Sequence, residues 1–350
     1  MILNSYAVLD AFVALLRGLT GILVVVLSLA AWRKSRGPIA PESRKALEDR
    51  GSLLFLLAFL LLGLNIISWP LLYLLLQSYV PEWPGVMCIY GVTQIGAGSI
   101  GPSRFLPELL KVLEITKPAL VFAGGAWFVL YLLNRRAANS PLYNRILAGI
   151  LCVGVLATAD AAIEGAYLAI PKKEKFLATG CCTEAFDTLD QSSKFLPKAL
   201  FKVNIRPILY GAYYGINGGL ILALWIAARS FGLGGIVGQL VVLGLFLVAV
   251  FVALPISAIF LIEIASPTLL HQPYHHCPYD LVPQVPESVL AVALHLWATF
   301  CVGWAGVAVW FGRSGETETF VPDMAHRIQM IGCWCYLASL VMMTVELALA

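Results

Sequence analysis

Four cysteines that lie outside the long apolar stretches are the first candidates for chemistry. They are Cys88, Cys181, Cys182 and Cys277. An even number of cysteines in an oxidising compartment can form disulfides, for example with Cys88 and Cys277 each bonded to one of the adjacent pair. Thiol–disulfide exchange is the alternative; it needs a reactive thiol beside a resolving one, but no Cys-x-x-Cys occurs in these segments. Structural disulfides and redox chemistry therefore both stay open.

A histidine-rich segment next to the last of these cysteines predicts a metal site. His271, His275, His276 and Cys277 fall within seven residues. Imidazole and thiolate ligands suit copper, zinc or haem iron. Pro273 and Pro278 favour an irregular loop over a helix here. Because the segment lacks both the paired spacing of a structural zinc site and the Cys-x-x-Cys-His of covalent haem attachment, other loops would have to complete the ligand set.

Ionisable residues inside the apolar stretches form a second candidate site. They are Asp10, Arg17, Asp160, Glu164, Glu263, His295 and Glu346. Such residues are costly at bilayer depth unless they are paired or face a cavity, so each is a functional hypothesis. Asp160 and Glu164 lie one helical turn apart on one face. The set predicts a polar cavity for a cation, a quinone head group or a proton path; the alternative is that Arg17 pairs with one acid and the others reach the interface.

Composition identifies the elements that must position these residues. Of the 350 residues, 60% are hydrophobic and only 12% are charged, and the mean hydropathy is +0.85. A water-soluble fold of this length cannot bury so much apolar surface, so the bilayer must be its solvent. The long continuous runs favour helices over barrel strands. We predict an all-α polytopic membrane protein with eight helices arranged as hairpins, at about 7–32, 52–79, 117–134, 146–170, 207–228, 236–265, 287–312 and 328–349.

The distribution of basic residues predicts how these helices are oriented. Short segments 33–50 and 134–145 are rich in Lys and Arg and are expected to be cytoplasmic. Both termini and the loops 80–116, 171–206 and 266–286 are then extracytoplasmic, although six lysines in 171–206 weaken this assignment. The first apolar stretch lacks a basic leader, so it is interpreted as a mature helix. In this orientation the loop cysteines and the intramembrane charges gather near one side of the bilayer.

A short repeat suggests that the hairpins share an origin. Ser103–Pro107 (SRFLP) recurs as Ser193–Pro197 (SKFLP), and each copy leads to a basic residue followed by proline, Lys117-Pro118 or Arg206-Pro207. This spacing predicts a repeated unit whose extracytoplasmic loop contains a short interfacial helix.

Three functions are compatible with these patterns. The first is a cell-envelope membrane component that presents Cys/His loops for redox or metal and cofactor handling, with an extracytoplasmic redox or metalloprotein partner. The second is a transporter or proton-coupled channel that uses the intramembrane carboxylates. The third is a scaffold subunit of a membrane complex with structural disulfides. The net charge of +3 comes from dispersed residues, which excludes a nucleic-acid surface. The sequence does not decide whether the chain is an enzyme.

Overall fold

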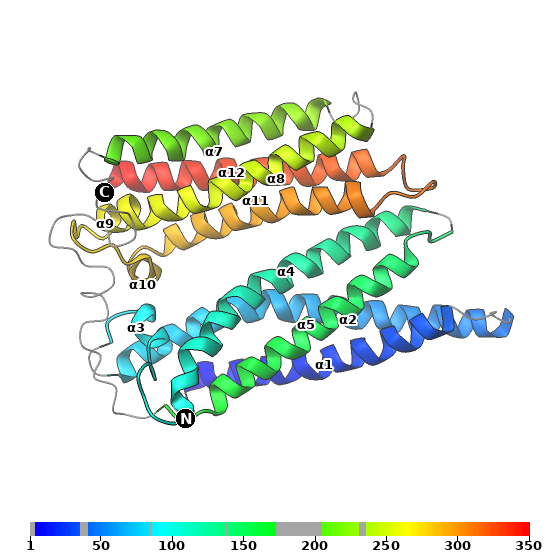
Figure 1. Cartoon of the computed structure of the whole chain (residues 1–350), viewed down its shortest axis with the longest axis horizontal. Helices are drawn as coiled ribbons and strands as arrows, with labels where there is room; N and C mark the ends of the chain where they lie inside the picture. The colour runs from blue at the N-terminus through cyan, green and yellow to red at the C-terminus, as the bar shows by residue number, and fades with distance from the viewer. Residues whose placement is uncertain (1–3, 36–40, 84–85, 138, 173–204, 231–235) are drawn as a thin grey trace. The chain divides into compact units, whose positions relative to one another are not determined.

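The chain folds into two all-helical units. The computed structural model describes residues 4–35, 41–83, 86–137, 139–172, 205–230 and 236–350 (Figure 1). Within these residues, eight helices are long and apolar enough to cross a membrane, which confirms the predicted all-α polytopic class. The chain divides into two compact units, Met1–Thr179 and Gly180–Ala350.

The first unit is an up-and-down four-helix bundle. Its long helices are α1 (Ser5–Ser35), α2 (Pro41–Tyr79), α4 (Leu106–Arg136) and α5 (Tyr143–Ala169). Each packs against the next along the chain, and α5 packs against α1 to close the ring. The connection between α2 and α4 contains the short elements η1 (Val80–Glu82), α3 (Ile89–Thr93) and η2 (Pro102–Phe105). This connection lies at the same end of the bundle as the start of α1.

The second unit repeats this ring of neighbours. Its long helices are α7 (Ile205–Ser230), α8 (Ile236–Phe260), α11 (Pro286–Phe311) and α12 (Val321–Leu349). Here too each helix contacts the next, and α12 contacts α7. The connection from α8 to α11 holds a π-helical turn, η4 (Leu261–Ala265), followed by α9 (Ser266–Leu269), η5 (Pro278–Asp280) and α10 (Leu281–Gln284).

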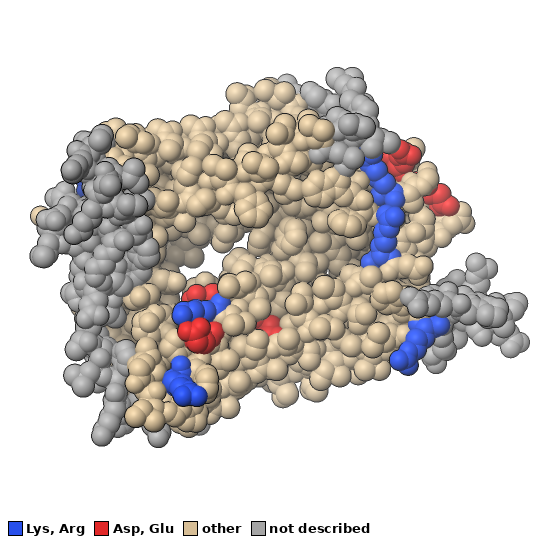
Figure 2. All heavy atoms as spheres, viewed as in Figure 1, with Lys and Arg blue, Asp and Glu red and all other residues tan. Residues whose placement is uncertain are grey.

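The helices carry apolar side chains outward and keep several polar ones inside. On α8, Phe251 is 77% exposed and Leu245 is 64% exposed, which suits lipid contact. Figure 2 shows a viewed face that is mostly tan, with Lys, Arg, Asp and Glu confined to a few places. Arg17 and Asp160, in contrast, are fully buried. The bilayer is thus the solvent for the outer surface, and the polar residues inside each bundle need another explanation.

The third span differs most in extent from its sequence prediction. The third was placed at 117–134, but the apolar helical stretch runs from Pro102 to Arg136 and the continuous helix α4 begins at Leu106. Residues 106–116, expected in a loop with an interfacial helix, therefore belong to the spanning helix itself. Pro118 is accommodated within α4 because proline removes one backbone hydrogen bond without necessarily ending a helix. The second copy of the repeat, 193–197, lies outside the described residues.

Small residues let α1 and α5 approach closely. A Cβ atom added to Gly154 would lie 3.0 Å from Val24 Cγ1 and 3.3 Å from the Gly21 carbonyl oxygen. A Cβ atom at Gly21 would lie 2.5 Å from Thr158 Oγ1. Glycine at both positions is therefore required by the packing, as in other close pairs of membrane helices. This contact sets the distance between Arg17 on α1 and the acids on α5.

Candidate functional site

Four charged side chains meet inside the first unit. Arg17 comes from α1, Lys117 from α4, and Asp160 and Glu164 from α5, and all four side chains are 0% exposed. We call these four residues the buried charge network. It lies within membrane-spanning segments, where unpaired charge would be most costly.

Each cation in the network contacts both acids. Arg17 pairs with Asp160 and with Glu164, the latter at 2.6 Å between Nη2 and Oε2. Lys117 Nζ lies 2.5 Å from Glu164 Oε1 and 3.2 Å from Asp160 Oδ2. The alternating arrangement of two cations and two anions offsets the desolvation of all four. Arg17 therefore pairs with two buried acids, whereas the alternative stated from the sequence gave it one, and Lys117 adds a second cation.

Hydroxyl groups complete the network. Ser68 Oγ on α2 accepts hydrogen bonds from Arg17 Nη1 at 2.5 Å and from Lys117 Nζ at 2.6 Å. Thr116 on α4 donates a hydrogen bond to Asp160. All four helices of the first unit therefore contribute a polar side chain to one point. Sites built in this way between facing helices are common in helical bundles.

A third acid, Asp10, lies beside the network. It is fully buried on α1, and neither carboxylate oxygen has a hydrogen bond of ordinary length. It is close enough to Glu164, Lys117 and Arg17 to interact with them electrostatically. With every group ionised, three acids would face two cations and leave one uncompensated negative charge. Inside a bilayer that excess favours the uptake of one positive charge, and a proton is the smallest one.

Helical spacing explains why these residues converge. Asp10 and Arg17 are seven residues apart, two turns of α1, and so share a face. Asp160 and Glu164 are four residues apart on α5. The glycine contact between α1 and α5 then brings the two faces together.

Sequence reasoning missed three members of this site. Lys117 was placed at the very start of the third span, next to the loop 80–116, and Ser68 and Thr116 were not singled out. The available signal was the apolar pattern of Leu106, Leu110 and Leu113, all buried, which extends the third helix by about three turns before Lys117. A helix begun at Leu106 places Lys117 well inside the span.

The chain gives no significant match to a family model, a curated protein or a solved structure.

The predicted Cys/His segment follows the end of α8 in the second unit. His275 Nε2 lies 2.6 Å from Asp280 Oδ2. A carboxylate oxygen of Asp280 also lies within 4.8 Å of the sulfur of Cys277, which is fully buried. The imidazole of His275 and the sulfur of Cys277 thus both lie near the carboxylate of Asp280. The sequence analysis did not single out this acid. His271, in contrast, is exposed and adopts a positive φ of 53°.

A second histidine of this segment contacts an intramembrane acid. His276 Nδ1 lies 3.2 Å from the Ile262 carbonyl oxygen and 3.6 Å from Glu263 Oε2. Glu263 sits in the π-helical turn, a feature often found at functional sites because it redirects one side chain. Two of the predicted ligands, His275 and His276, therefore each have an acidic neighbour within the second unit.

The remaining candidates are distributed over both units. In the first unit, Cys88 is buried immediately before α3, while Cys181 and Cys182 lie outside the described residues. Where the structure is described, no two cysteines form a disulfide. Glu346 lies on α12, with both carboxylate oxygens buried and without hydrogen bonds. The cysteines predicted within spans all lie on long helices: Cys152 on α5, Cys301 on α11, and Cys333 and Cys335 on α12.

Proposed function

We propose that this protein is a proton-coupled membrane transporter or channel whose coupling site is the buried charge network together with Asp10. The observation that carries the proposal is the excess of one acid over the cations at a fully buried point inside the membrane. A purely structural network would be expected to balance its charges. Here Asp10 has a carboxyl group that can take up and release a proton while the four paired residues hold its surroundings in place.

Coupling follows from the same charge count. When Asp10 is protonated the site is neutral, and when it is ionised the site carries one negative charge that a cation or a change in helix packing must compensate. Two states with different charge are the requirement for linking proton movement to a conformational change or to a second substrate.

Proton flux in proteoliposomes tests this function. A potassium gradient with valinomycin sets the membrane potential, and a trapped pH-sensitive dye reports proton entry. We expect Asp10→Asn to lower the flux at least about tenfold, because the amide cannot ionise. Glu108→Gln is the matched control, since Glu108 is an exposed acid paired with Lys111 on α4. Equal flux in Asp10→Asn and the wild type would contradict the proposal.

Infrared difference spectroscopy provides a readout that is independent of substrate. Titration of the wild type should produce a carbonyl band of a protonated carboxylic acid that Asp10→Asn removes and Glu108→Gln retains. Persistence of the whole band in Asp10→Asn would assign the proton to another group.

A second candidate function is metal or redox handling by the segment between α8 and α11. The pairing of His275 with Asp280 and the nearness of the Cys277 sulfur to Asp280 support it. In this function an extracytoplasmic partner protein would exchange the metal or electrons. Copper and zinc suit this mixed donor set better than haem iron, which needs an open face for the porphyrin. Metal analysis after incubation with Zn²⁺ or Cu⁺ should show bound ion in the wild type and loss in Cys277→Ser. Cys152→Ser on α5 is the control and should leave the metal content unchanged.

A further inference from the structure

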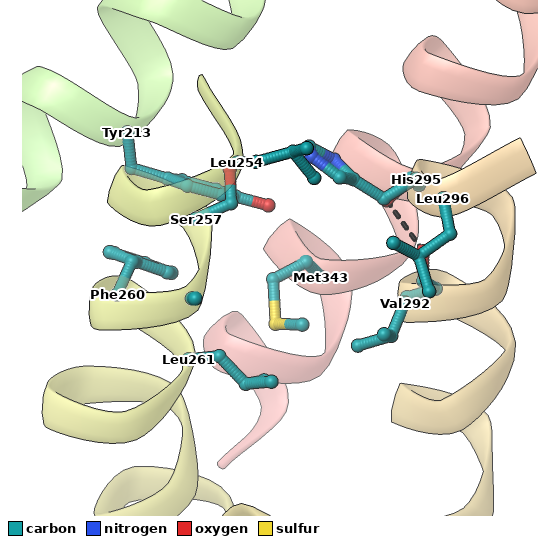
Figure 3. A pocket seen from close by; sticks show the side chains of 12 residues that line it. Tyr213, Leu254, Ser257, Phe260, Leu261, Val292, His295, Leu296 and Met343 are labelled. Carbon is teal, nitrogen blue, oxygen red and sulfur yellow. Dashed lines mark hydrogen bonds between the residues drawn. The ribbon is translucent and has the colours of Figure 1, made fainter. Parts of the chain in front are cut away.

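The second unit contains a cavity that the proposed function does not use. Its volume is about 130 Å³, and residues from all four long helices line it. Figure 3 shows Tyr213 of α7, Phe260 of α8 and Met343 of α12 around this space, with His295 of α11 reaching towards it. The cavity lies among membrane-spanning helices, so a ligand would reach it from the lipid phase.

The cavity walls suit a flat apolar ring. The rings of Tyr213 and Phe260 stack on each other with centroids 3.9 Å apart and planes 5° apart, which presents a rigid aromatic surface. The thioether of Met343 lies on the lining as well, and sulfur packs favourably against aromatic rings. An apolar cavity of about 150 Å³ is large enough for one benzene ring. This cavity, at about 130 Å³, is close to that volume, so it takes one six-membered ring at most, and a porphyrin is too large for it.

His295 lines the cavity together with Ser257 and Ser339, whose hydroxyl groups already have hydrogen-bond partners. The side chain is 9% exposed, and Nε2 is buried without a hydrogen-bond partner. The imidazole is held in place by an edge-to-face contact with Tyr336 at 5.0 Å, and the Tyr336 hydroxyl is in turn hydrogen-bonded to Thr299 at 2.8 Å. A buried imidazole nitrogen without a partner is costly, so a ligand that bonds to it gains affinity.

The ligand must therefore combine a ring with a hydrogen-bonding oxygen. Water alone is a poor occupant, because it needs two to four polar partners and most of the lining is apolar. A lipid acyl chain would leave His295 Nε2 unbonded. Nε2 can donate to a carbonyl in one tautomer and accept from a hydroxyl in the other, so both a quinone and its quinol satisfy it.

We propose that this cavity binds the head group of a lipid-soluble one-ring quinone or quinol, with His295 Nε2 bonded to a ring oxygen. Tyr213 and Phe260 contact the ring, and the isoprenoid tail extends through the open side of the cavity into the lipid. This inference concerns the second unit only and does not depend on proton transport through the network of the first.

Binding of ubiquinone-1 to the full chain in lipid nanodiscs, measured by isothermal titration calorimetry, tests the proposal. We expect His295→Leu to weaken binding about three- to tenfold, the effect of losing one hydrogen bond. His295→Gln keeps a hydrogen-bonding group and should bind more tightly than His295→Leu. His326→Gln on α12, outside the cavity lining, is the matched control and should bind like the wild type.

A second ligand separates the hydrogen bond from apolar contact. Prenylbenzene has a ring and tail but no oxygen, so it should bind more weakly than ubiquinone-1 and should be insensitive to His295→Leu. Ala258→Phe adds a ring to the cavity lining and should reduce binding of both ligands. The proposal is overturned if the wild type binds the two ligands equally, or if His295→Leu binds ubiquinone-1 like the His326→Gln control. The comparison of the two ligands remains decisive if a variant fails to fold, because it needs only the wild type.

Discussion

Arg17 illustrates how a charged residue is tolerated within the bilayer. Its guanidinium contacts Asp160 and Glu164 on α5 and Ser68 on α2. Removing the guanidinium therefore takes a cationic partner from two buried acids at once. Breaking a buried ion pair by removing one partner typically costs more than the pair contributes, since the remaining charge stays buried. The charge balance of the site therefore governs the stability of the first unit.

Arg17→Met should destabilise the protein by about 3–5 kcal/mol, the usual cost of an uncompensated buried charge. Adding Glu164→Gln to that variant removes one of the uncovered charges and should recover part of the loss. Unfolding in detergent, followed by circular dichroism, measures both effects. Arg327→Met is the control, because Arg327 forms an exposed pair with Asp323 and should change stability by less than about 1 kcal/mol. If adding Glu164→Gln lowers the stability of the Arg17→Met variant further, the charge-balance explanation is contradicted.

Lys172, just beyond α5, predicts a pH dependence of stability. Burial lowers the pKa of its amine to about 8, even though the amine lies over the rings of Tyr167 and Tyr79 and donates to the Tyr167 carbonyl. Between this pKa and the ordinary value of 10.5, the unfolded chain binds a proton that the folded chain does not. Stability from this group therefore rises with pH across that window and is lowest below pH 8.

Substitution of Lys172 by Met should remove this dependence. The variant should be more stable than the wild type at pH 7, by at most about 3 kcal/mol, and the difference should shrink as the pH approaches 10. Melting temperatures of both proteins from pH 7 to 10 provide the measurement. A difference that does not change with pH would assign the effect to packing.

The helices differ in how well their roles could be predicted from the sequence. The apolar runs placed all eight helices because bilayer thickness fixes their length, and the four-residue spacing of Asp160 and Glu164 gave their common face. Lys117 was missed because the third helix was started there, and helix ends are less certain than helix existence. The partners of Arg17 depend on which helices are neighbours, and a single sequence contains no such information.

The glycine contact between α1 and α5 gives a prediction at this scale. Gly154→Leu would push α1 away, since even a Cβ atom would lie 3.0 Å from Val24, and the displacement should separate Arg17 from Asp160. We expect a destabilisation of about 1–3 kcal/mol, typical of overpacking, together with reduced proton flux. Gly165→Leu on the same helix is the control, because nothing lies within 4 Å of a Cβ atom there. Equal stability of the two variants would show that the close contact is dispensable.

The whole chain combines two bundles with the same order of neighbouring helices and different interiors. The first encloses the buried charge network, and the second encloses the apolar cavity with His295 and carries the His275–Asp280 contact at the end of α8. Sequence analysis predicted a repeat of hairpins from two short words, whereas the structure shows the same ring of contacts in two sets of four helices. The two five-residue motifs, SRFLP and SKFLP, were too short to define the size of a repeat unit.

The orientation of the chain is the prediction that belongs to the whole molecule. Eight crossings place both termini on one side, and the basic residues near the opposite ends of the helices, including Arg33, Arg135 and Arg136, predict that the termini are extracytoplasmic. A C-terminal alkaline phosphatase fusion should therefore be active and a C-terminal green fluorescent protein fusion should be dark. The same reporters inserted between α4 and α5 should give the reverse pattern. If the C-terminal fluorescent fusion is bright, Cys277, His275 and the half of the first unit that holds the network would face the cytoplasm, and an extracytoplasmic partner for the Cys/His segment would be excluded.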